Sequence, residues 1–504
     1  MRSAKFIRVL AVCGMAAVGV GASAEGATIQ AGGCSQSQVV SAINSAKDGD
    51  TVVVPAGNCT WTSTVTIDGK SITLQGAGID ATVITDGIDS GGGAKPVLLQ
   101  WITKNTGLSR LTGFTFNGGS TGGKSWTTIV AFYGSTASLR IDHNKIIPTR
   151  VKGMEVSGYL RGVIDHNYWQ LDRGWFSQGL EIHHPNSGDV GDFGDNSWAQ
   201  PTNFGSSQFM FVEDNQFVAT GGQVYATDGW MGQRVVYRRN TFTNSTWANH
   251  GTETSGRWRS ARASEVYQNT FIVNTDGGSD WSLGAFPSAI GSRGGTSIVF
   301  DNNTQHSGGG SFQTVFDLQY YRSWDFSRPY PTWDYCNGSN SWDNNSAGRC
   351  IDQPGNGQGG YMSGYDATPH AWPNQSIEPV YIFNNLRIGS LAAGWSNANA
   401  RNIVADRDYY NQDPNFNGSS GMGRGPLSSR PSSCTAGVAY WATDQGEWDA
   451  SHSGPDGQLY KCVSNNSWSL YYTPYVYPHP LVSGGSAPVS TPAPQPPSNV
   501  RLIK

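Results

Sequence analysis

The sequence predicts an all-β solenoid, in which short coils of parallel strands stack on one another. A four-residue motif of one apolar residue, two variable residues and an asparagine occurs six times, with asparagines at positions 144, 167, 215, 240, 269 and 302. Their spacings of 23, 48, 25, 29 and 33 residues, the second being two periods of 24, are typical of a repeat architecture. No helical stretch long enough for a crossover separates the repeats, which excludes a doubly wound sheet.

The recurring asparagine has a structural role in such a solenoid. Stacked at a bend, each side-chain amide can donate to and accept from its neighbours along the column. Asparagine also tolerates the left-handed backbone conformation that a sharp corner needs. We therefore expect an asparagine ladder that specifies the fold and not the function.

Composition fits one long solenoid and excludes some partners. The 504 residues include 65 glycines and many aromatic residues, but only 14% are charged. This mixture suits tight turns and β-strands more than helices. The net charge of −4 argues against a nucleic-acid partner or an anionic membrane, because both attract a basic face.

The N-terminus predicts export. Residues 1–24 combine early basic residues, an apolar run and a small-residue cleavage site, so we expect a signal peptide and a mature chain that begins at Glu25. The product would be secreted, to the extracellular space or the periplasm. Six cysteines remain after Cys13, and proximity favours three pairs among the 15 possible connectivities: Cys34–Cys59, Cys336–Cys350 and Cys434–Cys462.

The remaining elements follow in order along the chain. Residues 25–70 predict an N-terminal cap, with an amphipathic helix over 35–46 that plugs the open end of the solenoid. Coils are expected over 71–390, interrupted by long excursions at 170–208, 243–263 and 304–378. Residues 391–482 predict a C-terminal cap or a small aromatic module, and the Pro/Ser-rich residues 483–504 predict an extended tail.

The cap helix, the following GDTVVVPAG stretch at 49–57, the repeated IDHN phrases and the asparagine ladder resemble the pectate-lyase-like superfamily. The similarity is greatest to secreted bacterial right-handed β-helix repeat proteins and covers about residues 35–390. It implies a right-handed parallel β-helix. The superfamily includes polysaccharide lyases, glycoside hydrolases, esterases and non-enzymatic adhesins, so the resemblance leaves the reaction open.

The segment from Tyr225 to Arg293 contains the densest set of candidate site residues. Stacking should bring Asp228, His250, Glu253 and Arg293 to one side of the helix, because adjacent coils lie about 4.8 Å apart. A β-eliminating lyase needs a base for the C5 proton, which His250 could supply, and a cation for the uronate carboxylate. Candidates for substrate contacts are, together with Arg293, the side chains of Arg257, Arg259, Arg262, Trp230, Trp258 and His183.

Two alternatives stay open for this segment. A glycoside hydrolase needs two carboxyl groups, and Asp228 with Glu253 would provide them. Ion-pair ladders between coils would explain the same charged residues without any catalysis. In the alginate- and chondroitin-lyase branch, a catalytic lysine and arginine occupy the coils where this sequence has Asp228 and His250, so His250 with a shifted Arg257 would have to substitute.

A second column of acids precedes the ladder. Asp142, Asp165 and Glu213 stand two residues before successive asparagines, and Arg238 follows in the next coil. Outward-facing stacked acids could bind Ca²⁺, which lyases of this fold use to bind uronates. We favour the alternative, in which these acids bond to local turns and Glu213 pairs with Arg238.

The sequence therefore favours a secreted monomer that binds and cleaves an extracellular polysaccharide, with a slight preference for a lyase on an acidic glycan. A glycoside hydrolase is the nearest alternative. The third is a non-catalytic adhesive protein that binds carbohydrate.

Overall fold

The computed structural model describes most of the chain between residues 26 and 484, and the account below concerns those residues: 26–91, 93, 95–104, 107–120, 127–149, 152–171, 178–184, 195–219, 224–251, 259–273, 288–306, 314–318, 343–344, 349–359, 375–387, 390–391, 395–397 and 403–484. The predicted signal peptide and the predicted tail beyond residue 484 lie outside them.

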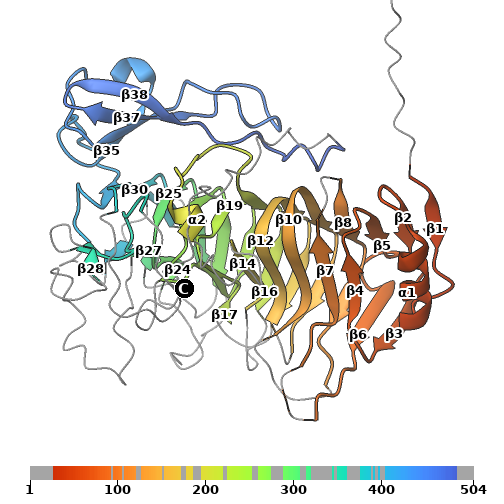
Figure 1. The fold of residues 1–504 in the computed structure, drawn as a ribbon. Helices are drawn as coiled ribbons and strands as arrows, with labels where there is room; N and C mark the ends of the chain where they lie inside the picture. The colour runs from red at the N-terminus through yellow and green to blue at the C-terminus, as the bar shows by residue number, and fades with distance from the viewer. Residues whose placement is uncertain are drawn as a thin grey trace, which may run out of the picture.

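The chain folds into a right-handed parallel β-helix, as the repeats predicted (Figure 1). The strands form three walls. The long wall consists, in spatial order, of β1 (Thr28–Gln30), β2 (Thr51–Val53), β5 (Thr73–Gln75), β8 (Ser109–Thr112), β10 (Thr128–Asp142), β12 (Lys152–Asp165), β15 (Met210–Glu213), β19 (Arg234–Arg238), β22 (Ala263–Tyr267), β25 (Thr296–Phe300), β30 (Val380–Phe383) and β34 (Tyr409–Asn411).

A second wall, called the site wall below, includes the N-terminal halves of the long strands β10 and β12. Glycines with positive φ in both strands, Gly134 and Gly158, lie where the strands turn from one wall to the other. The other strands of this wall are β4 (Val65–Asp68), β7 (Leu99–Thr103), β14 (Leu180–His183), β17 (Val224–Tyr225), β18 (Thr227–Trp230), β21 (Ser245–Ala248), β24 (Ser288–Ser292), β27 (Thr314–Leu318) and β33 (Trp395–Asn397).

The third wall has eleven strands: β3 (Gly57–Trp61), β6 (Thr82–Asp86), β9 (Thr115–Asn117), β11 (Lys145–Ile147), β13 (Tyr168–Leu171), β16 (Gln216–Ala219), β20 (Thr241–Thr243), β23 (Thr270–Val273), β26 (Asn303–His306), β31 (Leu386–Arg387) and β32 (Ser390–Leu391). Its inward aromatic rings stack along the axis. The ring centroids are 4.5 Å apart from Trp169 to Phe217, 4.9 Å from Phe217 to Phe242 and 4.7 Å from Phe242 to Phe271. This column fills the core between the walls.

The asparagine ladder is confirmed. The Nδ2 of each asparagine donates to the Oδ1 of the next, at 2.9–3.1 Å, and the ladder extends one step further than predicted, to Asn385. The left-handed residue is not the asparagine but the residue before it, with φ between 51° and 58° from His143 to Asn384. The asparagine must point inward to reach its neighbours, so the preceding residue makes the corner.

The predicted N-terminal helix is also confirmed. Helix α1 (Gln36–Ser45) buries Val39, Ala42 and Ile43 against the first coils. The Nζ of Lys70 donates to three carbonyls at its C-terminal end, those of residues 43, 44 and 46. This cation compensates the negative end of the helix dipole.

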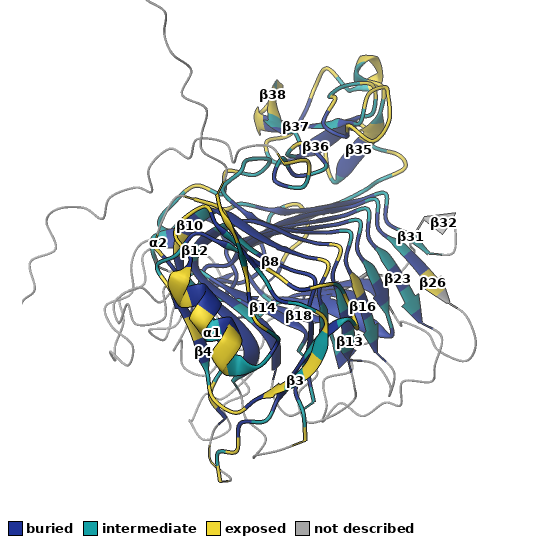
Figure 2. Ribbon diagram, turned by 90° about the vertical axis from the view of Figure 1, so that its right-hand side faces the viewer, coloured by how far each residue is buried: buried dark blue, intermediate teal, exposed yellow. Residues whose placement is uncertain are grey.

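Residues 422–472 form a separate antiparallel and parallel sheet on the flank of the long wall (Figure 2). Its strands, called the flank sheet below, are β35 (Met422–Gly425), β36 (Ala439–Ala442), β37 (Gln458–Ser464) and β38 (Ser467–Tyr472). The short elements α2 (Asp195–Trp198), β28 (Asp343–Asn344), β29 (Arg349–Cys350) and the 3₁₀ turn Leu427–Ser429 complete the described structure. The predicted disulfides Cys34–Cys59 and Cys434–Cys462 are present. Cys350 is also disulfide-bonded, and its predicted partner Cys336 lies outside the described residues.

Candidate active site

Two columns of polar side chains run along the outer face of the site wall. Parallel pairing puts Glu155 opposite Glu181, and Glu181 opposite Asp228. Two positions further along the same strands, Ser157 pairs with His183, and His183 with Trp230. Intervening residues such as Ile182 point inward and are buried, because successive side chains in a strand alternate between faces. Register alone therefore gathers these groups.

Asp228 and His250 form a hydrogen-bonded pair between successive coils. The Nδ1 of His250 lies 3.0 Å from the Asp228 Oδ2. The same carboxylate accepts from the Nε2 of Gln178 at 2.9 Å and from the amide of Gly229 at 2.8 Å. Burial alone would raise the pKa of Asp228, but the charges of His250 and Arg293 and these hydrogen bonds hold it well below its usual range. Asp228 is therefore an ionised acceptor that orients the imidazole.

Arg293 lies in the coil after His250 and approaches the same ring nitrogen as Asp228. Its Nη2 is 2.9 Å from the His250 Nδ1, and its Nε donates to the Asn249 carbonyl at 3.0 Å. The Asn249 side chain accepts from the Arg293 amide at 2.7 Å. The sequence prediction that stacking brings Asp228, His250 and Arg293 together is confirmed as geometry.

The predicted substrate contacts Trp230 and His183 adjoin this trio. The ring centroid of Trp230 is 5.2 Å from that of His250, and its indole Nε1 donates to the His183 Nε2. Burial and the nearby Lys152 lower the pKa of His183 to about 3, so this imidazole is neutral. The hydrogen bond to the neutral imidazole of His183 fixes the indole of Trp230, which gives the site an aromatic surface beside the Asp228–His250 pair.

Two carboxylates of the site were not among the predicted site residues. Glu181 is buried and its Oε1 lies 2.5 Å from the Nζ of Lys152. Glu155, with a side chain 21% exposed, has its pKa raised to about 7 by burial and by the negative charge of Glu181. The alternation of inward and outward side chains in strand β12 could have shown that Glu155 faces outward. The pairing of β12 with β14 could not be predicted, because the asparagine repeat does not give the position of β14.

Five predicted site residues are not part of this cluster. Arg259 and Arg262 are almost fully buried elsewhere: Arg259 forms a two-point ion pair with Asp352, and Arg262 pairs with Glu378 at 2.9 Å. Their role as substrate contacts is therefore corrected to a structural one. Three candidates lie outside the described residues: Glu253, Arg257 and Trp258.

The second acidic column forms ion pairs instead of an open calcium site. Asp142 accepts from Arg110 at 2.6 and 2.7 Å, and Asp165 from Arg140 at 2.9 and 3.1 Å. Glu213 pairs with Arg238 at 2.6 Å, as the favoured alternative predicted. All three acids are fully buried, so they do not fit Ca²⁺.

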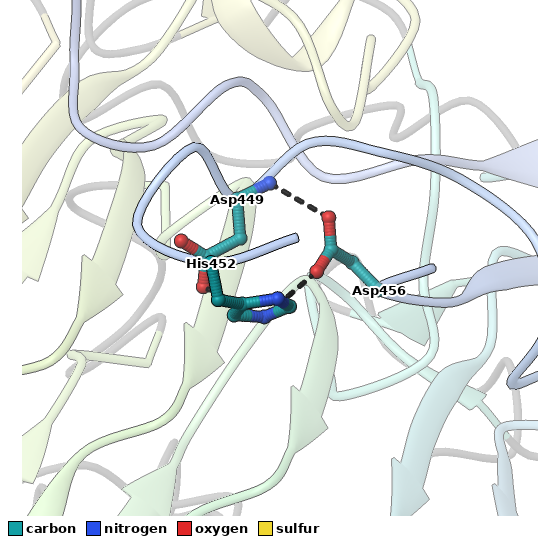
Figure 3. A group of neighbouring side chains, drawn as sticks. All are labelled: Asp449, His452 and Asp456. Atoms are coloured by element: carbon teal, nitrogen blue, oxygen red, sulfur yellow. Dashed lines mark hydrogen bonds and ion pairs between the residues drawn. The ribbon is translucent and has the colours of Figure 1, made fainter. Parts of the chain in front are cut away.

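Among the described residues, one group of three side chains has metal-ligand types close together: Asp449, His452 and Asp456 (Figure 3). Asp456 accepts from the amides of Trp448 and Asp449, at 2.7 and 2.8 Å, and its other oxygen lies 2.9 Å from the His452 Nε2. Asp449 forms an ion pair with Arg239 of the long wall. These bonds explain the cluster as a turn that ties the flank sheet to the helix.

Comparison with known proteins adds remote structural likenesses. No protein-family model matches the chain, and no curated protein matches it. One similar solved structure is the PL6-family alginate lyase AlyGC in a mutant form, with 13% identity and a TM-score of 0.35 over 78% of this chain and 52% of that one. Another is the ORF18 protein of Geobacillus virus E2, with 16% identity and a TM-score of 0.29 over 57% and 54%.

A third is an alginate lyase from Paenibacillus sp. strain FPU-7, with 12% identity and a TM-score of 0.24 over 74% of this chain and 98% of that one. The present chain thus spans about half the length of the first two structures. The fold assignment rests on the strand pairing itself. Within the described ranges, no helix combines the length and the hydropathy needed to cross a bilayer.

Proposed function

We propose that the protein is an exported polysaccharide lyase that cleaves an acidic glycan by β-elimination at the site wall. The observation that carries this proposal is the trio of Asp228, His250 and Arg293 on three successive coils, in which the His250 Nδ1 lies 3.0 Å from the Asp228 Oδ2 and 2.9 Å from the Arg293 Nη2. An oriented imidazole beside a guanidinium provides the base and the cation that this reaction needs.

The roles follow from the contacts. The Nδ1–H of His250 donates to Asp228, which leaves the lone pair on Nε2. His250 takes the proton from C5 of a uronate unit on this Nε2, and Asp228 stabilises the imidazolium that forms. Arg293 lies where it can balance the negative charge that develops on the uronate carboxylate. The C5–H electron pair becomes the C4=C5 double bond, and the C4–O4 bond breaks.

The leaving O4 then takes a proton from water, which completes the elimination. Glu155 lies three coils before His250, which corresponds to roughly 14 Å along the axis at about 4.8 Å per coil. C5 and O4 are neighbours in one sugar, so Glu155 is too far from His250 to be the proton donor. Trp230 offers a ring face to the sugar beside His250.

The contacts of Asp228 favour elimination over hydrolysis. A hydrolase using Asp228 and Glu253 needs one of them to stay protonated as the acid. The lowered pKa of Asp228 excludes it as the acid near neutral pH. To act instead as the base or nucleophile, Asp228 would have to give up the hydrogen bonds that its oxygens accept from His250, Gln178 and the Gly229 amide.

Export is supported by the signal-like residues 1–24 and by the two disulfides, since such bonds persist in oxidising compartments. We propose that the mature chain acts as a monomer on an extracellular polymer.

The test is incubation of the mature protein with a panel of acidic and neutral polysaccharides, with and without Ca²⁺. Ultraviolet absorbance of unsaturated uronates and new reducing ends are followed together. Both signals should rise on an acidic polymer. Reducing ends without absorbance would mean hydrolysis and would overturn the lyase assignment. Binding without either signal would favour the adhesive alternative.

A further inference from the structure

His143 and His166 occupy the left-handed corners of two adjacent coils, where the chain passes from the long wall to the third wall. Their φ angles are 53° and 54°, and each precedes an asparagine of the ladder. Their rings are stacked, with centroids 5.1 Å apart and planes within 4° of parallel. Both side chains are open to solvent, with exposed fractions of 57% and 44%.

Each ring is oriented by a buried carboxylate. The Nδ1 of His143 lies 2.9 Å from the Asp142 Oδ2, and that of His166 lies 2.9 Å from the Asp165 Oδ2. Both acids are fully buried and locked by arginines. A carboxylate that accepts from Nδ1–H leaves the lone pair on Nε2, at the opposite edge of the ring. Carboxylate, histidine and metal occur in this order in many protein metal sites.

The fold does not itself require histidine at these corners. The equivalent left-handed positions in the following coils are occupied by Asp214, Arg239, Gln268, Asp301 and Asn384. Two consecutive histidines, both backed by carboxylates and both exposed, therefore call for a further explanation.

We propose that His143 and His166 together bind one divalent transition-metal ion, such as Cu²⁺, Ni²⁺ or Zn²⁺, through their two Nε2 atoms. Imidazole ligands suit these metals. With metal–nitrogen bonds of about 2.1 Å, two neighbouring nitrogens of a tetrahedral or square-planar ion lie roughly 3.0–3.4 Å apart. The rings are parallel, with centroids 5.1 Å apart, so they must tilt toward each other until the two Nε2 lone pairs converge on the ion. Both side chains are exposed enough to make this movement.

The surrounding charge favours a cation. Asp142 and Asp165 face the rings directly, and Asp214 follows at the next corner, where it accepts from the hydroxyl of Tyr477 at 2.9 and 3.0 Å. Arg110 and Arg140 oppose this, but both are engaged with Asp142 and Asp165. Water would complete the coordination sphere of the ion.

The test uses the full mature chain without a histidine tag. Titration with Cu²⁺, followed by calorimetry and electron paramagnetic resonance, should give one ion per chain with nitrogen ligands. His143→Asn and His166→Asn keep a residue suited to the left-handed corner but remove the imidazole. Each should weaken binding by more than about 10-fold and remove a nitrogen from the spectrum.

The matched control is His452→Asn, which removes the histidine of the Asp449 cluster and should leave Cu²⁺ binding unchanged. Unchanged thermal unfolding of the metal-free variants shows that the corner is intact. The proposal is overturned if the wild type binds no ion, if binding survives in both corner variants, or if only the control loses it.

Discussion

His250 lies beside the carboxylate of Asp228 and the guanidinium of Arg293, which come from the neighbouring coils. These two charges decide when the imidazole gains or loses a proton. Its Nδ1 faces the Asp228 carboxylate and the Arg293 guanidinium at nearly equal distances. The carboxylate favours a proton on Nδ1, whereas the guanidinium disfavours a second positive charge nearby. The imidazole can therefore take up a proton only while Asp228 balances it.

This arrangement predicts the effect of changing His250 itself or its partner Asp228. His250→Ala should lower turnover by about 10²- to 10⁴-fold, the usual contribution of a general base. Asp228→Asn should lower turnover while leaving substrate binding nearly unchanged, because the amide keeps the shape but not the charge. Steady-state kinetics on the polymer found active in the panel provide the measurement, with His452→Asn as a control. Full activity of His250→Ala would remove it from the mechanism.

A second prediction at this scale concerns Glu155 and pH. The pKa of Glu155 rises from an ordinary 4.5 to about 7 in the folded chain, so the folded state binds more protons than the unfolded state between these values. Stability from this group is thus lost as pH rises from about 4.5 through about 7. The unfolding midpoint in denaturant, measured at pH 5 and pH 8, should differ less in Glu155→Gln than in the wild type. An equal pH dependence in both proteins would contradict the raised pKa.

At the scale of the element, the asparagine ladder joins the coils through one corner. Each asparagine satisfies its neighbour's amides: the Oδ1 of Asn240, for example, accepts from the backbone N–H and the Nδ2 of Asn215, both at 3.0 Å. It also donates to the carbonyls of Val212 and Arg238. Because Asn240 is buried, water cannot replace these partners.

Asn240→Ala should therefore lower the free energy of unfolding by about 1–3 kcal/mol or more, the cost of leaving buried polar groups unpaired. Thr241→Ala, on the half-buried side chain that follows it, should change the free energy by less than about 0.5 kcal/mol. Denaturant titration of the two variants makes the comparison. Equal losses would mean that the ladder is incidental to stability.

The same element shows why the fold was predictable from the sequence. The asparagines recur because every coil needs the same inward amide, so the period was visible without any structure. The trio of Asp228, His250 and Arg293 was found because those residues precede ladder asparagines. Glu155 and Glu181 were not assigned to this site, since their pairing depends on the position of strand β14, which the repeat does not predict. Arg259 and Arg262 were misplaced for the same reason, because Asp352 and Glu378 reach them from a distant excursion.

At the scale of the whole molecule, the flank sheet is joined to the long wall by buried aromatic and ionic contacts. Trp441 packs on Phe300 with ring centroids 4.9 Å apart, and the hydroxyl of Tyr472 donates to Glu265 at 2.6 Å. The aromatic residues of the predicted C-terminal cap or aromatic module, such as Trp441 and Trp448, are buried in this contact. A sequence rich in aromatics cannot by itself separate a sugar platform from an internal interface.

Arg238 links the two parts most directly. It is fully buried, pairs with Glu213 at 2.6 Å, and donates to the carbonyls of Tyr475 and Val476 at 2.7 and 2.9 Å. Arg238→Met would leave the Glu213 carboxylate buried without its cation and would release both carbonyls. Loss of one partner of a buried pair costs about 3–5 kcal/mol.

We therefore expect Arg238→Met to turn a single thermal transition into two, with the segment that contains Tyr475 and Val476 released first and cut by protease before the helix unfolds. Arg430→Met is the matched control, because Arg430 stacks on Tyr460 and Trp468 within the flank sheet. Calorimetry with limited proteolysis distinguishes the two variants. A single transition in Arg238→Met, with protease resistance equal to that of the control, would mean that the aromatic contacts hold the flank sheet without this ion pair.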